Sequence, residues 1–320
     1  MINRLKQNLI NKNKTIVFPE GNDERILKAS QMLVQENIAK VIVLGDEEEI
    51  LTIAKNNNIE ISGIEIINIK KSKMFDSYLN TFFELRNGKN SLEECKNMLS
   101  NENYFAVLML KCGDCDAVLC GAKYSTADTV RPALQILKTK KDYRIVSSCF
   151  LMLKEGVNPL IFADCAINVN PNAQDLSDIA IQSATSAKMF GLEPKLGFLS
   201  FSSKGSGKDE TIDEINNAMK LLKEKQVDFE FDGEFQFDTA FDAGVAKSKA
   251  PNSKLAGNVN VFIFPDLNSG NIGYKIAQRM GGYQALGPIL QGVSKPINDL
   301  SRGCNVSDIY KMAIITLSQD

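Results

Sequence analysis

The sequence has 320 residues and not one histidine, and this absence removes several classes of active site. A Ser-His-Asp triad, a Cys-His pair and a zinc site with imidazole ligands are all excluded. If the chain is an enzyme, its proton-transfer group must be an aspartate, glutamate, lysine, tyrosine or cysteine. Long apolar runs are also lacking: none approaches the roughly 18 residues that a membrane span needs, so we expect a soluble protein without a membrane partner.

The chain lacks an excess of either charge. Its 37 Lys and Arg residues nearly balance its 39 Asp and Glu residues, which argues against nucleic acid as a partner because a phosphate backbone is normally met by a concentrated basic surface. The N-terminus has no continuous apolar stretch of the signal-peptide kind. The seven cysteines are odd in number and scattered, unlike a disulfide framework. We therefore expect a cytoplasmic protein with reduced thiols.

Short runs rich in β-branched residues alternate with amphipathic stretches along the chain. Strands are expected at 15–18 and 41–44, each followed by a helix, over 23–37 and 47–55. This alternation is typical of βαβ units with parallel strands buried on both faces. Further strands are expected at 64–69, 117–120, 145–153, 160–169, 196–201 and 259–264. The pattern predicts a doubly wound α/β fold.

The length favours two domains or one large α/β domain. No linker or internal repeat marks a boundary, but the two long apolar runs after Tyr143 and Arg144 suggest that a new sheet begins there. Loops with Pro and Gly are expected over roughly the last sixty residues before a closing helix, and such loops are where function usually lies.

One motif resembles a phosphate-binding loop but is incomplete. Residues 203–208 read Ser-Lys-Gly-Ser-Gly-Lys ahead of an expected helix. Ser202 stands where a Walker loop needs glycine, Asp209 stands where it needs Ser or Thr, and Glu210 occupies the third glycine position of a Rossmann pattern. The segment is interpreted as a plain strand-to-helix turn.

A second motif, the CxxC pair of Cys112 and Cys115, has Cys120 close by. No second cysteine pair and no histidine supplies the missing metal ligands, and Cys120 lies in an apolar run typical of a core. Neither a metal nor a redox site is expected.

The final polar segment carries the first candidate site. Ser301 and Arg302 lie in a loop just before an expected helix, and Asp308 lies in its first turn. Asn305 and Asp308 could simply cap this helix, because an acid in the first turn is favoured by the helix dipole. Alternatively, backbone N–H groups and the guanidinium form an anion site with a carboxylate nearby as base.

A second candidate segment follows the strand expected at 117–120. It therefore lies at the carboxyl end of a strand, where ligands of α/β sheets usually bind. Ser125, Thr126 and Arg131 suit phosphate, whereas ordinary helix capping by Ser125 with Asp128 is an equally good interpretation.

A third candidate segment follows the strand expected at 259–264. It contains Asn271 and leads into a helix on which Lys275 and Arg279 lie one turn apart. A solvated basic face is as good an interpretation as a ligand site. Three phosphate-compatible segments in one chain are more suggestive than any one of them.

With these segments in view, the chain resembles the phosphate acetyltransferase (phosphotransacetylase) family and, more distantly, the phosphate butyryltransferases. The matching segments run nearly from end to end and are 17–21, 125–133, 232–238, 262–267, 269–275 and 295–304. The resemblance implies two α/β/α domains with a cleft between them, an architecture like that of the isocitrate and isopropylmalate dehydrogenases, and a homodimer. The first domain would comprise residues 1–143 and 291–320, and the second 144–290.

The resemblance also implies roles for particular residues. Ser301, Arg302 and Asp308 look like the catalytic group. Arg86, Arg131 and Arg279 look like arginines for phosphate or coenzyme A. Ser125, Thr126, Asn271 and Lys275, from the segments above, complete the expected substrate-binding set.

The expected reaction is reversible transfer of acetyl between coenzyme A and inorganic phosphate, by direct attack in a ternary complex, with coenzyme A as substrate and no bound cofactor or metal. In a chain without histidine, Asp308 is the natural base for the coenzyme A thiol. Arg302 would neutralise the charge that develops on the carbonyl oxygen and leaving phosphate, and Ser301 would donate a hydrogen bond. The alternatives are a phosphate butyryltransferase and a non-catalytic acyl-CoA-binding regulatory domain; a dehydrogenase rests on architecture alone, which does not establish function.

Overall fold

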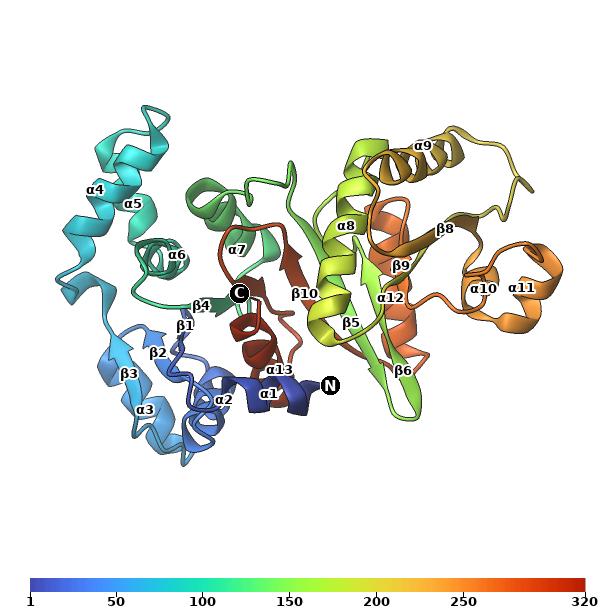
Figure 1. Cartoon of the computed structure of the whole chain (residues 1–320). Helices are drawn as coiled ribbons and strands as arrows, with labels where there is room; N and C mark the ends of the chain where they lie inside the picture. Colours follow the sequence, from blue (N-terminus) through green and yellow to red (C-terminus); the bar gives the residue numbers. More distant parts are fainter. Residues whose placement is uncertain (320) are drawn as a thin grey trace. The chain divides into compact units, whose positions relative to one another are not determined.

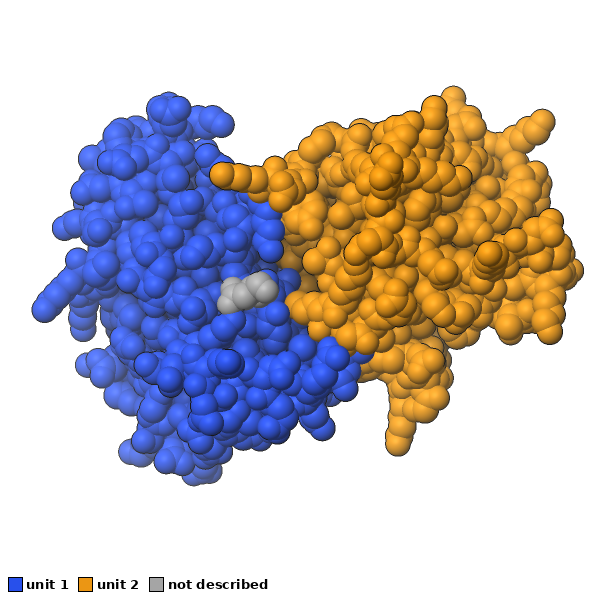
Figure 2. Space-filling model, viewed as in Figure 1, with its two compact units in different colours: residues 1–140, 293–320 blue, residues 141–292 orange. Residues whose placement is uncertain are grey.

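The computed structural model describes residues 1–319 and divides into two compact units. Unit 1 comprises residues 1–140 and the C-terminal part of the chain from 293, and unit 2 comprises residues 141–292 (Figure 2). The chain therefore leaves unit 1 once and returns to it. Among residues 1–319, no helix has both the length and the apolar character required to cross a lipid bilayer.

Unit 1 is built on a five-stranded sheet in the order β11-β4-β1-β2-β3, with every neighbouring pair parallel. The strands are β1 Thr15–Phe18, β2 Lys40–Leu44, β3 Ile64–Ile67, β4 Ala117–Cys120 and β11 Ile297–Asp299. β1 and β4 are almost wholly buried, as expected for parallel strands covered on both faces. The parallel α/β character predicted for this part of the chain is confirmed.

Helices cover the sheet of unit 1 (Figure 1). They are α1 Ile2–Leu9, α2 Glu24–Gln35, α3 Glu47–Asn56, α4 Phe75–Arg86, α5 Leu92–Leu99, α6 Glu102–Cys112, α7 Thr126–Pro132 and α13 Val306–Leu317, with a 3₁₀ turn at Ile69–Lys71 and a π-helical turn at Ala133–Leu137. α2 is amphipathic and buries Ile26, Leu27 and Leu33, and it packs against α13. The last helix of the chain thus belongs to the core of unit 1.

Unit 2 is built on a six-stranded sheet in the order β10-β5-β6-β9-β7-β8. The strands are β5 Ser147–Lys154, β6 Val157–Ala163, β7 Lys195–Leu199, β8 Glu230–Phe235, β9 Val261–Ile263 and β10 Gln284–Gln291. The helices are α8 Ala173–Phe190, α9 Glu210–Glu224, α10 Phe237–Phe241, α11 Ala243–Lys249 and α12 Leu267–Arg279.

This second sheet is mixed, so the expectation of a doubly wound fold throughout needs correction. β5 runs antiparallel to both β6 and β10, whereas β6, β9, β7 and β8 are parallel. β5 and β6 form a hairpin whose turn contains Gly156 in the left-handed region, at φ +73°. The strand expected at 160–169 therefore begins and ends earlier, at Val157–Ala163.

β10 and β11 lie in the region where the sequence predicted only loops. β10 contains Gly287 and Pro288, and its register shifts between Leu286 and Ile289. A bulge tolerates glycine and proline in a strand, and β10 borders the sheet, where proline costs no shared hydrogen bond. Because of these residues β10 is not a continuous apolar run, and the sequence pattern did not predict it.

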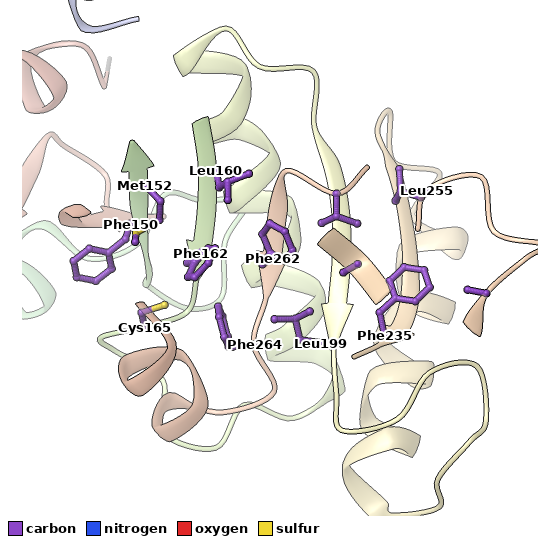
Figure 3. Close-up of a cluster of buried hydrophobic side chains, with 13 residues drawn as sticks. Phe150, Met152, Leu160, Phe162, Cys165, Leu199, Phe235, Leu255, Phe262 and Phe264 are labelled. Carbon is purple, nitrogen blue, oxygen red and sulfur yellow. The ribbon is translucent and has the colours of Figure 1, made fainter. Parts of the chain in front are cut away.

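The core of unit 2 is rich in aromatic side chains (Figure 3). The ring of Phe162 on β6 lies 5.3 Å from that of Phe262 on β9 and 5.2 Å from that of Phe264, measured between ring centroids. Such tilted and edge-on pairs are the favoured arrangements of aromatic rings. They join the neighbouring parallel strands at the base of the turn that leads into α12.

Candidate active site

The carboxyl ends of three neighbouring strands of unit 1 form one edge. Because β11, β4 and β1 are adjacent and parallel, the segments that follow them emerge together. Residues 19 and 20 follow β1, residues 121–125 follow β4, and residues 300–302 follow β11. Two of the three candidate segments, which are far apart in the sequence, therefore meet at this edge.

Glu20 is a buried carboxylate at this edge, only 2% exposed. Its two oxygens accept hydrogen bonds from the backbone N–H groups of residues 122, 123 and 124, at 2.9, 2.6 and 3.0 Å. A row of converging N–H groups of this kind is an anion site. Glu20 already fills it, so these amides are not free to bind phosphate.

Arg25 on α2 ties the segment after β11 to the segment after β4. One guanidinium nitrogen, Nη1, donates to the carbonyl oxygens of Arg302 and Cys304 at 3.0 and 2.9 Å, and Nη2 donates to the carbonyl of Ala122 at 2.9 Å. The same guanidinium binds the carboxylate of Asp23, with Nη2 2.8 Å from Oδ2. The loop of Ser301 and Arg302 is therefore held by a charged side chain from a different βα unit.

Asp299, the last residue of β11, is fully buried. Its carboxylate accepts hydrogen bonds from the hydroxyl groups of Thr126, at 2.7 Å, and Thr129, at 2.8 Å. Burial raises the pKa of Asp299 from 3.8 to about 6, since a charged carboxylate is disfavoured away from water. Thr126, expected to bind substrate, thus directs its hydroxyl hydrogen to Asp299.

Ser301 and Arg302 are both exposed on the loop after β11. The Ser301 hydroxyl accepts a long hydrogen bond, 3.3 Å, from the N–H of Gly303. Within residues 1–319, the Arg302 guanidinium makes no hydrogen bond or ion pair, and it is available to an anionic ligand.

Asp308 lies in the first turn of α13, half-buried. It forms a capping box: the side chain of Asn305 accepts from the N–H of Asp308 at 3.0 Å, and Asp308 Oδ2 accepts from the N–H of Asn305 at 3.1 Å. The capping interpretation is confirmed. It leaves room for a second role, because a carboxylate has about four acceptor sites.

Ser125 likewise caps α7. Its hydroxyl donates to Asp128 Oδ2 at 2.6 Å and accepts from the N–H of Asp128 at 3.3 Å. The capping interpretation of this segment is confirmed too, and Ser125 and Thr126 both have partners within the protein.

Arg86 on α4 and Arg131 on α7 both lie close enough to Tyr104 for their charges to affect its pKa. Burial raises the pKa of Tyr104, and the positive charges of Arg131 and Arg86 oppose this rise. Arg86 Nε donates to the side-chain oxygen of Asn90 at 2.7 Å, while Arg131 is exposed on α7. The structure therefore brings these two sequence-predicted arginines into one region of unit 1.

The remaining candidates lie on α12 of unit 2. Asn271 donates to the carbonyl of Cys165 at 3.1 Å, and Lys275 donates to the side-chain oxygen of Asn271 at 2.7 Å. Arg279 is exposed in the last turn, one turn beyond Lys275 as predicted. The three side chains follow i, i+4, i+8 spacing and share one side of the helix.

A cavity of about 390 Å³ in unit 1 adjoins the segments after β1 and β4. Its lining includes Glu20, Asn22, Asp46, Lys70 and Lys123. Polar side chains that converge on a concave space at strand ends are the usual form of a small-molecule site.

The segment at 203–208 is confirmed as a strand-to-helix turn between β7 and α9. The carboxylate of Glu234, 4% exposed, accepts from the Ser202 hydroxyl at 2.8 Å and from the N–H of Gly205 at 2.7 Å. An acid in this position repels phosphate.

The three clustered cysteines do not form a ligand set. Cys115 and Cys120 are buried, and burial raises the pKa of both thiols well above the usual value, while Cys112 is exposed. Across residues 1–319, no group of three or more His, Cys, Asp or Glu side chains is placed as metal ligands would be.

Sequence reasoning missed Glu20, Arg25 and Asp299. A signal was present for Glu20, a charged residue just after the β-branched run 15–18, but not for Asp299, because the residues before it do not form a continuous apolar run. In a parallel sheet such positions are close to ligands or to the loops that bind them. Arg25 gave no comparable signal, since a charged residue in the first turns of a helix is ordinary.

An all-parallel sheet whose strand ends carry converging polar loops, one of them with an available guanidinium, is an arrangement in which α/β enzymes bind small anionic substrates. The sequence profile of the phosphate acetyl/butaryl transferase family matches residues 1–317. The chain belongs to this family, and it is an acyltransferase. The resemblance inferred from the sequence is confirmed.

Individual relatives agree. The chain is 47% identical over 319 residues to the phosphate acetyltransferase of Bacillus subtilis, covering 100% of this chain and 98% of the relative. It is similar to the crystal structure of a phosphotransacetylase from Streptococcus pyogenes, with 48% identity, a TM-score of 0.94 and coverage of 99% of this chain and 97% of the other. A branched-chain phosphotransacylase from Enterococcus faecalis shares the fold at 16% identity, with a TM-score of 0.69 over 96% of this chain and 98% of the other.

Proposed function

We propose that this acyltransferase moves acetyl reversibly between coenzyme A and inorganic phosphate by direct attack in a ternary complex. Relatives of nearly equal length and 47% identity named phosphate acetyltransferase support the choice of acyl group and acceptor. The observation that carries the proposal for the site is the exposed, unpartnered guanidinium of Arg302 beside Ser301, at the carboxyl edge of the parallel sheet.

The proposed chemical step needs no protein nucleophile. The thiol of coenzyme A gives its proton to the Asp308 carboxylate, and the sulfur attacks the carbonyl carbon of acetyl phosphate. A carbon–sulfur bond forms while the bond from carbon to the phosphate oxygen breaks, and inorganic phosphate leaves. Acetyl phosphate already carries a good leaving group, so positioning and electrostatics supply most of the catalysis.

Arg302 and Ser301 are proposed to stabilise the transition state. The guanidinium would face the negative charge that develops on the carbonyl oxygen and the leaving phosphate, and the Ser301 hydroxyl would donate a hydrogen bond. Both groups are exposed and weakly engaged within the protein, which supports this role.

The remaining candidates are proposed to bind substrate. Arg86 and Arg131 suit phosphate or the phosphates of coenzyme A, because a guanidinium matches the geometry of phosphate oxygens. Asn271, Lys275 and Arg279 offer a row of donors along α12. Ser125 and Thr126 are proposed to contribute through the helix start they organise.

No metal, no bound cofactor and no covalent intermediate take part in the proposed mechanism. The deciding experiment mixes the purified protein with coenzyme A and acetyl phosphate in the presence of a chelator and follows thioester formation, with butyryl phosphate in parallel. Fast, chelator-resistant transfer with acetyl phosphate supports the proposal. A preference for butyryl phosphate would move the assignment to the longer acyl chain, and binding without turnover would indicate a regulatory acyl-CoA-binding role.

We propose further that the enzyme is a cytoplasmic homodimer. Unit 2 exposes large apolar side chains, among them Phe237, Phe241, Ile276 and Met280, the last 85% exposed. Clustered exposed apolar side chains are typical of subunit interfaces. Seven free thiols suit a reducing compartment. Light scattering of the purified protein tests the dimer.

A finer architectural likeness to the isocitrate and isopropylmalate dehydrogenases is also a proposal. The α/β class of both units supports it. A crystal structure with coenzyme A bound would test it.

A further inference from the structure

We propose that Asp299 is a positioning residue for acetyl transfer: it locks the start of α7 to the end of β11, and so fixes the loop that carries Ser301 and Arg302. The proposal rests on the proposed roles of those two residues. Every contact that carries it lies within unit 1.

The carboxylate of Asp299 accepts hydrogen bonds from two threonine hydroxyl groups of α7. Thr126 and Thr129 are one turn apart on α7, so their hydroxyl groups face the same way. One donates to Oδ2 of Asp299 and the other to Oδ1, at 2.7 and 2.8 Å. Asp299 and Thr129 are both fully buried, so water does not compete for the bond between them, whereas Thr126 is half-buried.

The lock extends to the catalytic loop through the backbone. The N–H of Leu300, next to Asp299, donates to the carbonyl of Cys120 at 2.7 Å. Gly121 fits beside this junction only because it has no side chain: a Cβ there would meet Oδ1 of Asp299 and the backbone of Leu300. Ser301 follows directly, so a shift of the Asp299 carboxylate displaces the loop at its root.

The charge of Asp299 makes the lock sensitive to pH. The titratable groups that face its carboxylate are Glu20, after β1, and the thiol of Cys120, on β4. Burial, reinforced by the negative charge of Glu20, raises the pKa of Asp299 to about 6, while the two threonine hydroxyls oppose the rise. When ionised, Asp299 accepts from both threonines. When protonated, it must donate its own hydrogen, and one threonine loses its acceptor.

A buried acid of this kind is an unfavourable choice for stability alone. Asparagine has nearly the same shape and carries no charge to desolvate. If Asp299 only held the fold together, replacing it with asparagine would lower stability and activity together. If it positions the loop, activity falls without a matching loss of stability.

The test compares Asp299→Asn with the wild-type enzyme in the assay with coenzyme A and acetyl phosphate, together with the thermal unfolding midpoint. We expect kcat to fall by about tenfold to a hundredfold, the usual cost of a misplacement near the chemistry, with both KM values changed by less than about threefold. The unfolding midpoint above pH 7 should be unchanged or higher. An inflection of kcat near pH 6 in the wild type should disappear in Asp299→Asn and persist in Asp308→Asn.

Threonine variants give the matched controls. Thr129→Val removes the hydroxyl at constant shape and should lower kcat, whereas Thr129→Ser keeps the hydroxyl and should restore it. As a control elsewhere in unit 1, Tyr78→Phe removes a hydroxyl that donates to the Asp114 carboxylate, and it reports the effect of lost stability away from β11 and α7.

Two results would overturn the proposal. One is an Asp299→Asn enzyme that keeps wild-type kcat within about twofold and retains the inflection near pH 6. The other is a fall in kcat that only follows the loss of stability, as in Tyr78→Phe. Failure of the underlying catalytic assignment is recognised separately, because Arg302→Ala would then stay fully active whatever Asp299→Asn does.

Discussion

Unit 1 and unit 2 both carry candidate substrate-binding residues after a strand, but they hold them in different ways. In unit 1, Arg302 lies on an irregular loop whose backbone accepts a hydrogen bond from Arg25 and which follows the buried Asp299, itself bonded to Thr126 and Thr129 of α7. In unit 2, Lys275 and Arg279 project from a regular helix, whose own backbone hydrogen bonds set their spacing. The candidate catalytic group on the loop is therefore supported by charged side chains from elsewhere in unit 1, whereas the candidate binding groups on the helix are positioned by the helix itself.

The buried carboxylates of the two units show the same contrast. Asp164, after β6, accepts from the N–H groups of residues 166, 167 and 168, so it organises its own loop. Glu20, after β1, accepts from residues 122–124, about a hundred positions away in the sequence. The site of unit 1 therefore forms only when two distant βα units have docked, whereas the loop of unit 2 is local.

The largest effect is expected from Arg302→Ala. Turnover should fall by roughly two to three orders of magnitude, the usual scale for a preorganised donor that faces developing charge. Stability should hardly change, because the guanidinium is exposed. Steady-state kinetics measure this, with Arg144→Ala, an exposed arginine of unit 2 with one long ion pair to Asp175, as the control. Full activity in Arg302→Ala would remove it from the mechanism.

The pH dependence of stability should separate Asp299 from the other acids. Its folded pKa of about 6 lies above the ordinary 3.8, so the folded state binds the proton more tightly than the unfolded state. The resulting stabilisation is complete below the ordinary pKa and is lost as the pH rises through the folded pKa. Denaturant unfolding should be measured for both proteins at about pH 4 and about pH 7. From the lower to the higher pH, the free energy of unfolding of Asp299→Asn should rise by roughly 2–3 kcal/mol relative to that of the wild type. Parallel curves for the two proteins would show that Asp299 titrates normally.

Arg279→Ala tests the role of the helix-borne candidate residues of unit 2. A helix-borne binding residue should raise KM for coenzyme A by about tenfold, equivalent to about 1.4 kcal/mol, with little change in kcat or stability. Lys220→Ala, an exposed lysine on α9, is the matched control. A fall in kcat with constant KM would instead give Arg279 a catalytic role.

The smallest effect is expected from Ser125→Ala. The variant loses the N-cap of α7, which should lower the free energy of unfolding by about 1 kcal/mol. If Ser125 only caps the helix, KM for phosphate measured in the direction of acetyl phosphate synthesis stays constant. An increase of that KM would show that the hydroxyl contacts substrate as well.

The sequence was sufficient for the strands β1 to β4 of unit 1 and for the family. Strands such as 117–120 are continuous apolar runs, since both their faces are covered, and this makes them visible without a structure. Capping was also readable, because Asn305 with Asp308 and Ser125 with Asp128 each satisfy a local rule of spacing.

What escaped prediction depends on contacts between distant parts of the chain. β10 and β11 were missed because a bulge, a proline and polar residues interrupt their apolar pattern. Arg25 and Asp299 were missed because their roles exist only through partners in other βα units. No local spacing encodes such partners. The substrate-binding roles of the candidate residues stay predictions.

The path of the chain has a consequence for how the enzyme is made. β11, the loop of Ser301 and Arg302, and α13 all belong to unit 1, yet they are synthesised after the whole of unit 2. While the ribosome is still adding unit 2, the nascent chain presents β4 as an open edge and Arg25 without the carbonyl oxygens of residues 302 and 304. On the proposed roles of Ser301 and Arg302, the catalytic loop is therefore placed in one late step, when the returning strand docks beside β4.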